Sequence, residues 1–267
     1  MMPGPPSVRP LALVTGASRG IGREMSLKLA ARGYDLVLVA RSREELLVLA
    51  LELETAFGAS AQVVDVDLTS SDAAPRIFEA VGGRTLTLLA NNAGFGTHGD
   101  FVWLARTDLQ RQLDMVQVNV SSLLHLTGLF LPGMVEQGGG HVLNVSSTAS
   151  FQPGPGMATY YATKAFVTSF SEALAHELRG TGVTVTAHCP GPVATDFARV
   201  AATGRVRFNA WGLASAEHIA EHALVAAHAG RVVSIPGLMN FLMAQSLRFT
   251  PRAVVRAVAA WANRQVG

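Results

Sequence analysis

The chain has 267 residues, of which 49% are hydrophobic and 15% charged, with a formal net charge of +2 and a pI of about 9.0. This composition predicts a sizeable buried core and excludes an intrinsically disordered chain. The basic residues are scattered rather than clustered, which argues against a nucleic-acid-binding protein. Cys189 is the single cysteine, so no intramolecular disulfide can form, and we expect a protein of the reducing cytoplasm.

Residues 1–10 are rich in proline and glycine and hold no apolar run, so we expect a disordered leader rather than a signal peptide or membrane anchor. No stretch of the sequence reaches the roughly 18 consecutive apolar residues expected of a membrane-spanning helix. We expect residues 11–267 to form a single domain, because no linker or internal repeat divides them.

Short apolar runs alternate with stretches of helical spacing along the chain. The expected strands are 11–15, 36–40, 61–66, 86–90, 141–145, 183–187 and 231–235. The expected helices are 20–32, 42–57, one from about 71, 112–137, 159–179 and 216–229. This alternation predicts an α/β fold: a doubly wound, seven-stranded parallel sheet with helices on both faces, the Rossmann fold. Ligands of such sheets bind beyond the carboxyl ends of the strands.

Three glycines, Gly16, Gly20 and Gly22, follow the first expected strand. A tight turn favours glycine, and a backbone that approaches a pyrophosphate has no room for a Cβ atom. The helix that opens near Gly20 points free N–H groups at such an anion. A plain tight turn is the alternative, but the position after the first strand favours a dinucleotide site. The candidate cofactor contacts in this turn are Gly16, Ser18, Arg19, Gly20, Ile21 and Gly22.

No acid follows the second expected strand, which ends in Ala40-Arg41-Ser42-Arg43. Sites that prefer NAD place an acid there to hold the ribose 2′-hydroxyl. Arg41, with Ser42 beside it, could instead contact a 2′-phosphate, and Arg19 could reach the same group. The sequence therefore favours NADP(H) over NAD(H), with a merely solvated Arg41 as the alternative.

Small polar residues follow the third and fourth expected strands. A carboxylate at Asp67, next to Leu68, could accept a hydrogen bond from an adenine amino group. Asn92, Ala93 and Gly94 form a small, polar stretch where the chain could pass close to a ligand. Ordinary turn chemistry explains both stretches equally well.

Tyr160 and Lys164 lie four residues apart in an expected helix, so they share one face. The ordinary pKa of tyrosine is about 10, and a neighbouring cation lowers it. Lys164 could therefore make a tyrosine an acid–base catalyst. Tyr161 is three residues from Lys164, and spacing alone leaves both tyrosines as candidates.

Taken together, these motifs resemble the classical short-chain dehydrogenase/reductase family over about residues 11–235. The matching motifs stand in the family's order: Thr15-Gly16-x-x-x-Gly20-x-Gly22, Asn91-Asn92-Ala93-Gly94, Tyr160-x-x-x-Lys164 and Pro190-Gly191. The resemblance implies an NADP(H)-dependent oxidoreductase that transfers a hydride between the cofactor and a carbonyl or secondary alcohol. We also expect a homodimer or homotetramer.

The resemblance also implies the roles of the candidate catalytic residues. It selects Tyr160 over Tyr161 as general acid and base, and Ser147 over Ser146 as the residue that orients the carbonyl. Lys164 would lower the tyrosine pKa and bind the nicotinamide ribose, and Asn119 would hold a water between Lys164 and solvent. Further cofactor contacts would be Tyr160, Lys164, Pro190, Gly191, Val193 and Thr195, with Thr195 anchoring the carboxamide. A non-catalytic NADP(H)-binding sensor of the same fold is the alternative.

The substrate itself is not encoded in a recognisable motif. We expect the pocket walls to come from 95–99, 148–157 and about 196–211. Four large residues within these stretches predict a small, apolar substrate: Phe151, Met157, Phe197 and Trp211.

Other patterns are assigned to structure rather than function. His218 and His222 with Glu221 match a zinc-protease pattern, but they fall in a late helix without a third ligand, so no metal is expected. Cys189 is expected to be a small buried residue. The end of the chain, 238–267, mixes large apolar residues with arginines. We expect an amphipathic helical extension that acts as a lid or a subunit interface, with weak membrane contact as the alternative.

Overall fold

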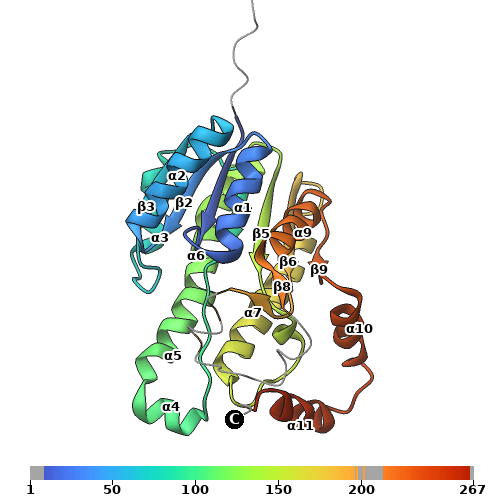
Figure 1. Cartoon of the computed structure of the whole chain (residues 1–267). Helices are drawn as coiled ribbons and strands as arrows, with labels where there is room; N and C mark the ends of the chain where they lie inside the picture. Colours follow the sequence, from blue (N-terminus) through green and yellow to red (C-terminus); the bar gives the residue numbers. More distant parts are fainter. Residues whose placement is uncertain (1–8, 196, 198–200, 202–212, 265–267) are drawn as a thin grey trace, which may run out of the picture.

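The computed structural model of the chain describes residues 9–195, 197, 201 and 213–264. A seven-stranded parallel sheet runs through it in the order β3-β2-β1-β4-β5-β6-β9. Its strands are β1 (Leu11–Thr15), β2 (Asp35–Ala40), β3 (Ala61–Asp65), β4 (Leu88–Asn91), β5 (Gly140–Val145), β6 (Val183–His188) and β9 (Val233–Ser234). The winding reverses between β1 and β4, which pair directly. The predicted doubly wound sheet is thereby confirmed (Figure 1).

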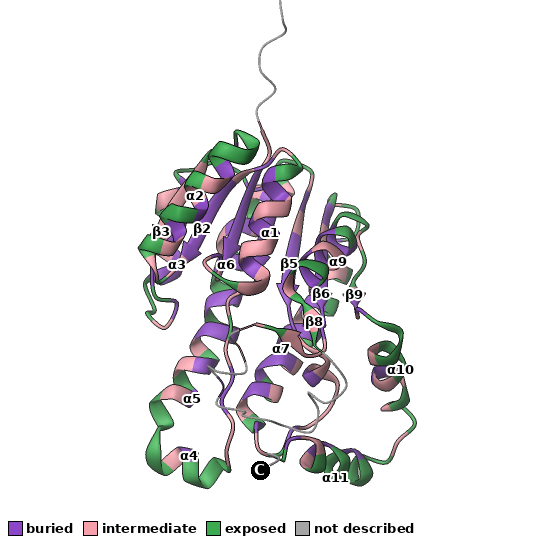
Figure 2. Cartoon of the chain, viewed as in Figure 1, coloured by how far each residue is buried: buried purple, intermediate pink, exposed green. Residues whose placement is uncertain are grey.

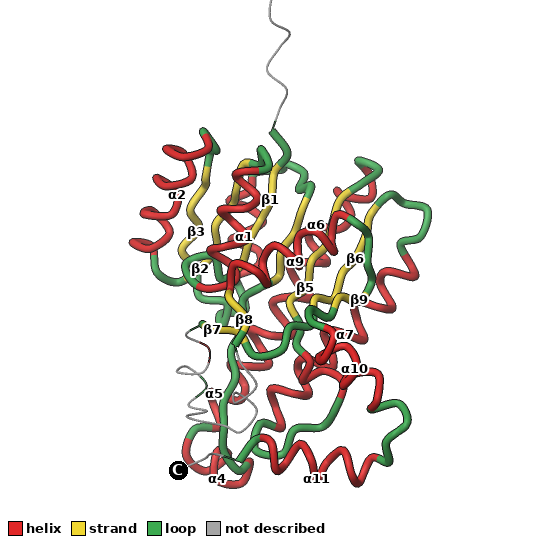
Figure 3. The backbone as a smooth tube through the Cα atoms, turned by 45° about the vertical axis from the view of Figure 1, so that its right-hand side comes forward, coloured by secondary structure: helices red, strands yellow, loops and turns green. Residues whose placement is uncertain are grey.

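Helices cover both faces of the sheet, as the tube in Figure 3 shows. The helices with regular geometry are α1 (Gly20–Ala31), α2 (Arg43–Phe57), α3 (Ala73–Val81), α4 (Phe101–Thr107), α5 (Leu109–Val116), α6 (Leu123–Glu136), α7 (Ala158–Glu177), α9 (Ala216–His228), α10 (Leu238–Ser246) and α11 (Arg252–Ala262). A π-helical segment, Gln117–Ser122, joins α5 to α6, and a 3₁₀ turn, Thr148–Phe151, follows β5.

Alternate strand residues divide the core into two layers, as the period of two along a strand requires. On β1, Ala12 and Val14 pack with α1, α2 and α9, whereas Leu11 and Leu13 pack with α3, α6 and α7. The central strands are accordingly buried along almost their whole length (Figure 2). Continuous apolar strands are the mark of a sheet that is covered on both sides.

The structure differs from the expected elements in four places. α4 was not expected; it is only seven residues long, and its first N–H groups are capped by Asp100. The expected helix 112–137 begins earlier, at Leu109, and contains the π-helical segment. The expected last strand, 231–235, shrinks to β9, because only Val233 and Ser234 pair with β6 at the sheet edge. A short parallel pair, β7 (Val193–Ala194) with β8 (Ala214–Ser215), lies outside the main sheet.

Among the described residues, one continuous helix has the length and composition of a membrane span, Leu109–Glu136, in which the mean hydropathy of an 18-residue window reaches 1.4. Its second half is part of the core: Leu126, Phe130 and Met134 are buried in the layer that covers β4 and β5. Core packing therefore accounts for its apolar character.

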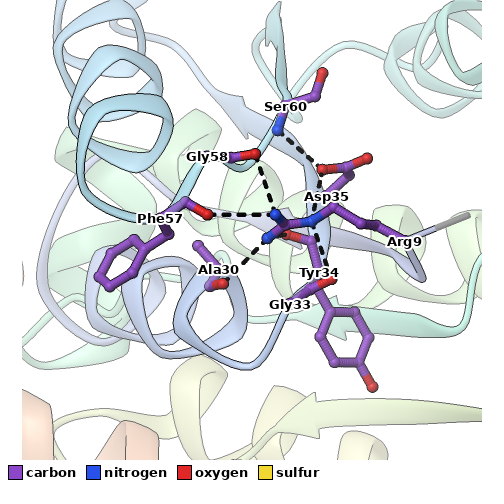
Figure 4. A network of polar contacts seen from close by, with 8 residues as sticks. All are labelled: Arg9, Ala30, Gly33, Tyr34, Asp35, Phe57, Gly58 and Ser60. Atoms are coloured by element: carbon purple, nitrogen blue, oxygen red, sulfur yellow. Dashed lines mark hydrogen bonds and ion pairs between the residues drawn. The ribbon is translucent and has the colours of Figure 1, made fainter. Parts of the chain in front are cut away.

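The end of the expected leader belongs to the folded domain. Residues 1–8 lie outside the described part, but the Arg9 guanidinium donates to the main-chain carbonyls of five residues: Ala30, Gly33, Tyr34, Phe57 and Gly58 (Figure 4). It also lies 3.3 Å from the Asp35 carboxylate, which accepts from the Ser60 N–H at 2.9 Å. For Arg9 and Pro10 the expected disorder is wrong, because Arg9 satisfies the carbonyls at the ends of α1 and α2.

Replacing Arg9 with alanine should lower the free energy of unfolding by about 1–3 kcal/mol, since hydrogen bonds from a charged donor contribute roughly this much. Urea unfolding followed by circular dichroism measures the loss. Arg9→Lys keeps the charge but lacks the planar fork, so it should recover only part of the stability. An Arg9→Ala variant as stable as the parent would show that the network contributes nothing.

Candidate active site

The glycine turn lies at the point where the winding of the sheet reverses. Gly16 and Gly20 have φ values of +67° and +53°, a region that favours glycine. A Cβ atom on Gly22 would lie 2.2 Å from the Gly16 carbonyl oxygen and 2.5 Å from Asn92 Nδ2. The turn is therefore a close-packed cradle in front of the N-terminus of α1, with the free N–H groups that a pyrophosphate would bind.

A cavity of about 340 Å³ runs from this turn to the C-terminal helix. Most of the predicted site residues line it: Gly16, Arg19, Gly20, Ile21, Asn92, Ala93, Gly94, Ser147, Tyr160, Lys164, Pro190, Gly191, Val193 and Thr195. The remaining predicted residues lie outside its wall: Ser18, Gly22, Arg41, Ser42, Asp67, Leu68 and Asn119. The structure thus gathers most of the nicotinamide half of the predicted site at the cavity together with Arg19, and leaves Arg41, Ser42, Asp67 and Leu68 outside the cavity wall.

Lys164 is buried beside the ring of Tyr160. Its Nζ donates to the Val145 carbonyl at 2.8 Å and lies 5.9 Å from the centre of the Tyr160 ring. Burial lowers the pKa of Lys164 to about 8. Burial also raises the pKa of Tyr160, although the Ser147 hydroxyl opposes this shift. The expected lowering of the Tyr160 pKa is therefore wrong for the chain alone, because loss of water around the phenolate raises the pKa more than the Ser147 hydroxyl lowers it.

The two candidate tyrosines make different contacts. The Tyr160 ring packs 5.2 Å from the Phe197 ring, centre to centre, and its hydroxyl interacts with Ser147. The Tyr161 hydroxyl instead donates to Asn263 Oδ1 at 3.1 Å. The Tyr161 ring lies against Gly154, where a Cβ atom would come within 2.3 Å of it. Tyr160 thus lies with Ser147 and Lys164, whereas Tyr161 is hydrogen-bonded to Asn263 at the end of α11.

The two candidate serines also differ. Ser146 is buried; its hydroxyl donates to the Lys164 carbonyl at 3.0 Å and shares a 2.7 Å hydrogen bond with Thr168. The Ser147 hydroxyl accepts from the Ala149 N–H at 3.1 Å, interacts with the Tyr160 hydroxyl and has a long contact, 3.5 Å, to the Pro190 carbonyl. The Ser147 hydroxyl hydrogen can therefore turn toward a carbonyl in the cavity, whereas Ser146 holds α7 against the sheet.

Asn119 lies in the π-helical segment and ties three elements together. Its Nδ2 donates to the Phe95 carbonyl at 2.9 Å and to Thr163 Oγ1 at 3.0 Å, and its Oδ1 accepts from the Phe95 N–H at 3.1 Å. Both amide hydrogens are thus taken. A water between Lys164 and solvent would have to use the second lone pair of Oδ1 or a main-chain carbonyl. π-Helical segments are frequent at functional sites.

The predicted adenosine half is held by ion pairs. The Nε of Arg19 lies 2.9 Å from both carboxylate oxygens of Glu45, and Arg41 Nη1 lies 3.9 Å from Asp67 Oδ2. Asp67 Oδ1 accepts from the Thr69 N–H at 3.0 Å, in an ordinary turn. Leu68 is buried, and its carbonyl accepts from Ser122 at 2.8 Å. A 2′-phosphate would compete with these carboxylates for the two arginines.

Asn263, which the sequence reading missed, fastens the C-terminal helix to the cavity. It caps α11 and lies 6% exposed. Its Nδ2 donates to the Pro155 carbonyl at 3.0 Å, its Oδ1 accepts from Tyr161, and its carbonyl accepts from His98 Nε2 at 2.7 Å. Ala259 and Val255, one and two turns earlier, are buried on the same face. This i, i+4, i+8 spacing in the sequence is the pattern from which the burial of Asn263 on one face of α11 could have been predicted.

The rest of the cavity wall is largely apolar, with Phe95, Ala149, Met157, Phe197 and Leu213 on it. Of the four large residues predicted to line it, Met157 and Phe197 do so, and Phe151 does not. Trp211 lies outside the described residues.

The side chains of the histidine–glutamate pattern in α9, for which no metal was expected, contact other residues. Glu221 pairs with Lys28 at 3.6 Å and Arg32 at 2.5 Å, and His222 Nδ1 lies 3.3 Å from Ser234 Oγ. In the described part of the chain, no group of three or more metal-binding side chains comes together. Cys189 is fully buried, which raises the pKa of its thiol.

The sheet, the glycine cradle at its reversal point and the cavity in front of it define a dinucleotide-binding α/β protein. The sequence model of the family described as "short chain dehydrogenase" matches residues 10–205. The chain belongs to this family, which confirms the resemblance that its motifs showed.

Curated relatives include "Very-long-chain 3-oxoacyl-CoA reductase" of Bos taurus, 36% identical over 71% of this chain. The protein of that name from Laccaria bicolor is 40% identical over 65% of this chain. The chain matches 61% and 52% of their respective lengths. Among solved structures, a short-chain dehydrogenase from Sphingobium yanoikuyae in complex with NADPH is 30% identical, with a TM-score of 0.81 and 92% and 94% of the two chains covered. A 7beta-hydroxysteroid dehydrogenase structure is 26% identical, with a TM-score of 0.84 and 94% and 96% covered.

Asn263→Ala should release α11 from the cavity wall. Since the side chain makes two hydrogen bonds, opening of this helix should become roughly tenfold more frequent. Limited trypsin cleavage after Arg252 and Arg256 measures this opening directly. Arg264→Ala, an exposed neighbour, is the control and should leave cleavage unchanged.

Tyr161→Phe removes the other partner of the same hydrogen bond, so the double variant with Asn263→Ala should show less than the sum of the two effects. Strict additivity, or an unchanged cleavage rate in Asn263→Ala, would show that this contact does not hold the helix.

Proposed function

We propose that the protein is an NADP(H)-dependent oxidoreductase that interconverts a ketone and a secondary alcohol on an apolar substrate. One observation carries the proposal: Ser147, Tyr160 and Lys164 meet in a single cavity that opens onto the glycine cradle. The cradle fits a dinucleotide, because the turn is packed too closely for side chains at Gly16 and Gly22 and the N-terminus of α1 follows it with free N–H groups. When bound there, the nicotinamide supplies or accepts the hydride.

The side chains of the cavity supply the remaining chemistry. In the reducing direction, the Ser147 hydroxyl donates a hydrogen bond to the substrate carbonyl oxygen and orients it. As hydride reaches the carbonyl carbon, negative charge grows on this oxygen, and the Tyr160 hydroxyl transfers its proton there. The raised pKa of Tyr160 keeps the phenol protonated before the transfer. The Lys164 ammonium then stabilises the phenolate until a proton returns through the water that we propose near Asn119.

The substrate class follows from the cavity wall and the relatives together. Phe95, Met157, Phe197 and Leu213 suit an apolar chain or ring. The names of the curated relatives specify a 3-oxoacyl thioester, in which a ketone is followed by such a chain. We therefore propose a 3-oxoacyl thioester as the substrate, reduced to the 3-hydroxyacyl thioester as NADPH becomes NADP⁺.

We propose NADP(H) as the preferred cofactor, in agreement with the NADPH complex of one structural neighbour. Another neighbour was solved in complex with NAD, so the preference here depends on this chain's own Arg19 and Arg41. Both arginines lie by the carboxyl ends of β1 and β2, and the β2 end carries no acid.

We also propose a homo-oligomer. Leu109, Leu113, Val116 and Leu124 are exposed along one side of the helix that runs through α5 and α6, and α7 packs beside α5. A helical stripe of this kind is suited to contact with a second copy. The cytoplasmic location stays a prediction.

Tyr160→Phe should lower the rate of NADPH-dependent reduction by roughly 100- to 10,000-fold, the contribution of a positioned general acid. Loss of NADPH absorbance with a 3-oxoacyl thioester measures the rate, and quenching of protein fluorescence measures cofactor binding, which should stay unchanged. Tyr34→Phe, at the remote tyrosine beside His228, is the control. Reduction at the parent rate by Tyr160→Phe would refute the mechanism. NADPH binding without turnover of any carbonyl compound by the parent protein would instead favour the sensor.

Arg41→Ala should weaken NADPH binding by roughly 10- to 100-fold, because one charge-assisted contact to the 2′-phosphate is lost. NADH, which lacks that phosphate, should bind as before. Arg43→Ala is a matched control: it lies two residues away and pairs with Asp65 at 2.7 Å. Equal losses for NADPH and NADH, or an equal effect of Arg43→Ala, would contradict the assignment.

A further inference from the structure

The two C-terminal helices carry large apolar side chains on their outside. Leu238 is 74% exposed, and Phe249, between the helices, is 88% exposed. The other exposed apolar side chains here are Met239, Phe241, Leu242, Val254, Val258 and Trp261. We call these residues, with the arginines among them, the α10–α11 surface. Exposed apolar side chains in such number mark an interaction site rather than ordinary surface.

α11 is apolar on two sides. Val255, Ala259 and Asn263 form its buried face, which packs toward the cavity. Val254, Val258 and Trp261 follow the i, i+4, i+7 pattern of a second face, and all three are about half exposed. Packing within the domain explains the first stripe, and the exposure of the second stripe is a feature of interaction surfaces.

The charge of this region has one sign. Glu221 is the last acidic residue of the chain, and every charged residue after it is an arginine. Four of these, Arg248, Arg252, Arg256 and Arg264, lie on or next to the two helices, and all four are exposed. An exposed apolar surface whose formally charged side chains are all arginines has the composition of a segment that lies in the interface of an anionic membrane.

A second copy of the chain fits this surface poorly. The symmetric contact of a dimer brings a patch against itself, which here would set arginines against arginines without an acid to pair them. The exposed stripe of α5 and α6 already offers another face to a second copy. The charge therefore favours an anionic partner.

We propose that the α10–α11 surface binds the headgroup region of a bilayer that contains anionic lipids. Phe249 and the outer stripe of α11 enter the interface, and the arginines pair with lipid phosphates. Because Asn263 at the end of α11 lines the cavity, docking brings the cavity wall close to the lipid.

Sedimentation of the full-length protein with phosphatidylcholine vesicles, with and without phosphatidylglycerol, tests the proposal. Binding is expected with phosphatidylglycerol, and it should weaken as salt increases. The triple variant Arg248→Gln/Arg252→Gln/Arg256→Gln should bind these vesicles on the order of 100-fold more weakly, given the contribution of each basic residue near an anionic surface. Leu242→Ser/Phe249→Ser should also lose binding.

Matched controls lie on remote parts of the fold. Arg76→Gln/Arg84→Gln/Arg179→Gln removes the same charge, and Val48→Ser/Leu51→Ser removes exposed apolar side chains from α2; both should bind vesicles like the parent. NADPH binding should be unchanged in every variant, which shows that each one folds. Three results would overturn the proposal: no binding to anionic vesicles, equal losses in the controls, or a tail variant that dissociates the oligomer while binding vesicles normally.

Discussion

The hydroxyl of Thr15 joins the two halves of the sheet at the place where its winding reverses. It accepts hydrogen bonds from the N–H groups of Asn92 and Ala93, each at 3.0 Å, and donates to the Ala90 carbonyl at 3.3 Å. Asn92 Nδ2 returns a bond to the Thr15 carbonyl at 2.9 Å. The chains leaving β1 and β4 are thus fixed to each other, and the glycine turn packs against Asn92 with no space for a side chain at Gly22. The shape of the cofactor cradle depends on this clamp.

A layer of small polar side chains continues behind the candidate catalytic residues. Asn91 donates to Asn144 at 2.9 Å, and Asn144 donates to Ser171 at 2.9 Å, which ties β4 and β5 to α7. Ser146 and Asn119 attach the same helix at the Lys164 carbonyl and at Thr163. Buried polar groups destabilise a core unless they are paired. Here the pairing fixes the rotation of α7, and with it the direction of Tyr160 and Lys164.

The sequence was informative where function and local conformation coincide. The glycines, Asn92 and the pair Tyr160 and Lys164 lie in short segments that match the family's motifs in order, and the structure gathers them around one cavity. Contacts between distant segments left weaker traces. Asn263 meets Tyr161 and Pro155 across 102 and 108 residues, and no short motif encodes such a meeting. The sequence also does not reveal the π-helical segment, because one additional residue in a helical turn leaves the spacing of the apolar residues nearly unchanged.

The direction in which the Tyr160 pKa shifts shows a second limit of prediction from the sequence. Helical spacing correctly places a lysine beside the tyrosine, but a pKa depends on the whole surroundings of the group. Both side chains are buried, and desolvation disfavours the phenolate and the ammonium alike. A neutral tyrosine beside a lysine whose pKa is near 8 is suited to donating a proton while charge grows on a nearby oxygen, rather than to holding a phenolate beforehand. We therefore propose that Lys164 contributes to catalysis during the reaction itself. The negative charge that then forms on Tyr160 is stabilised by a lysine that is shielded from water by burial.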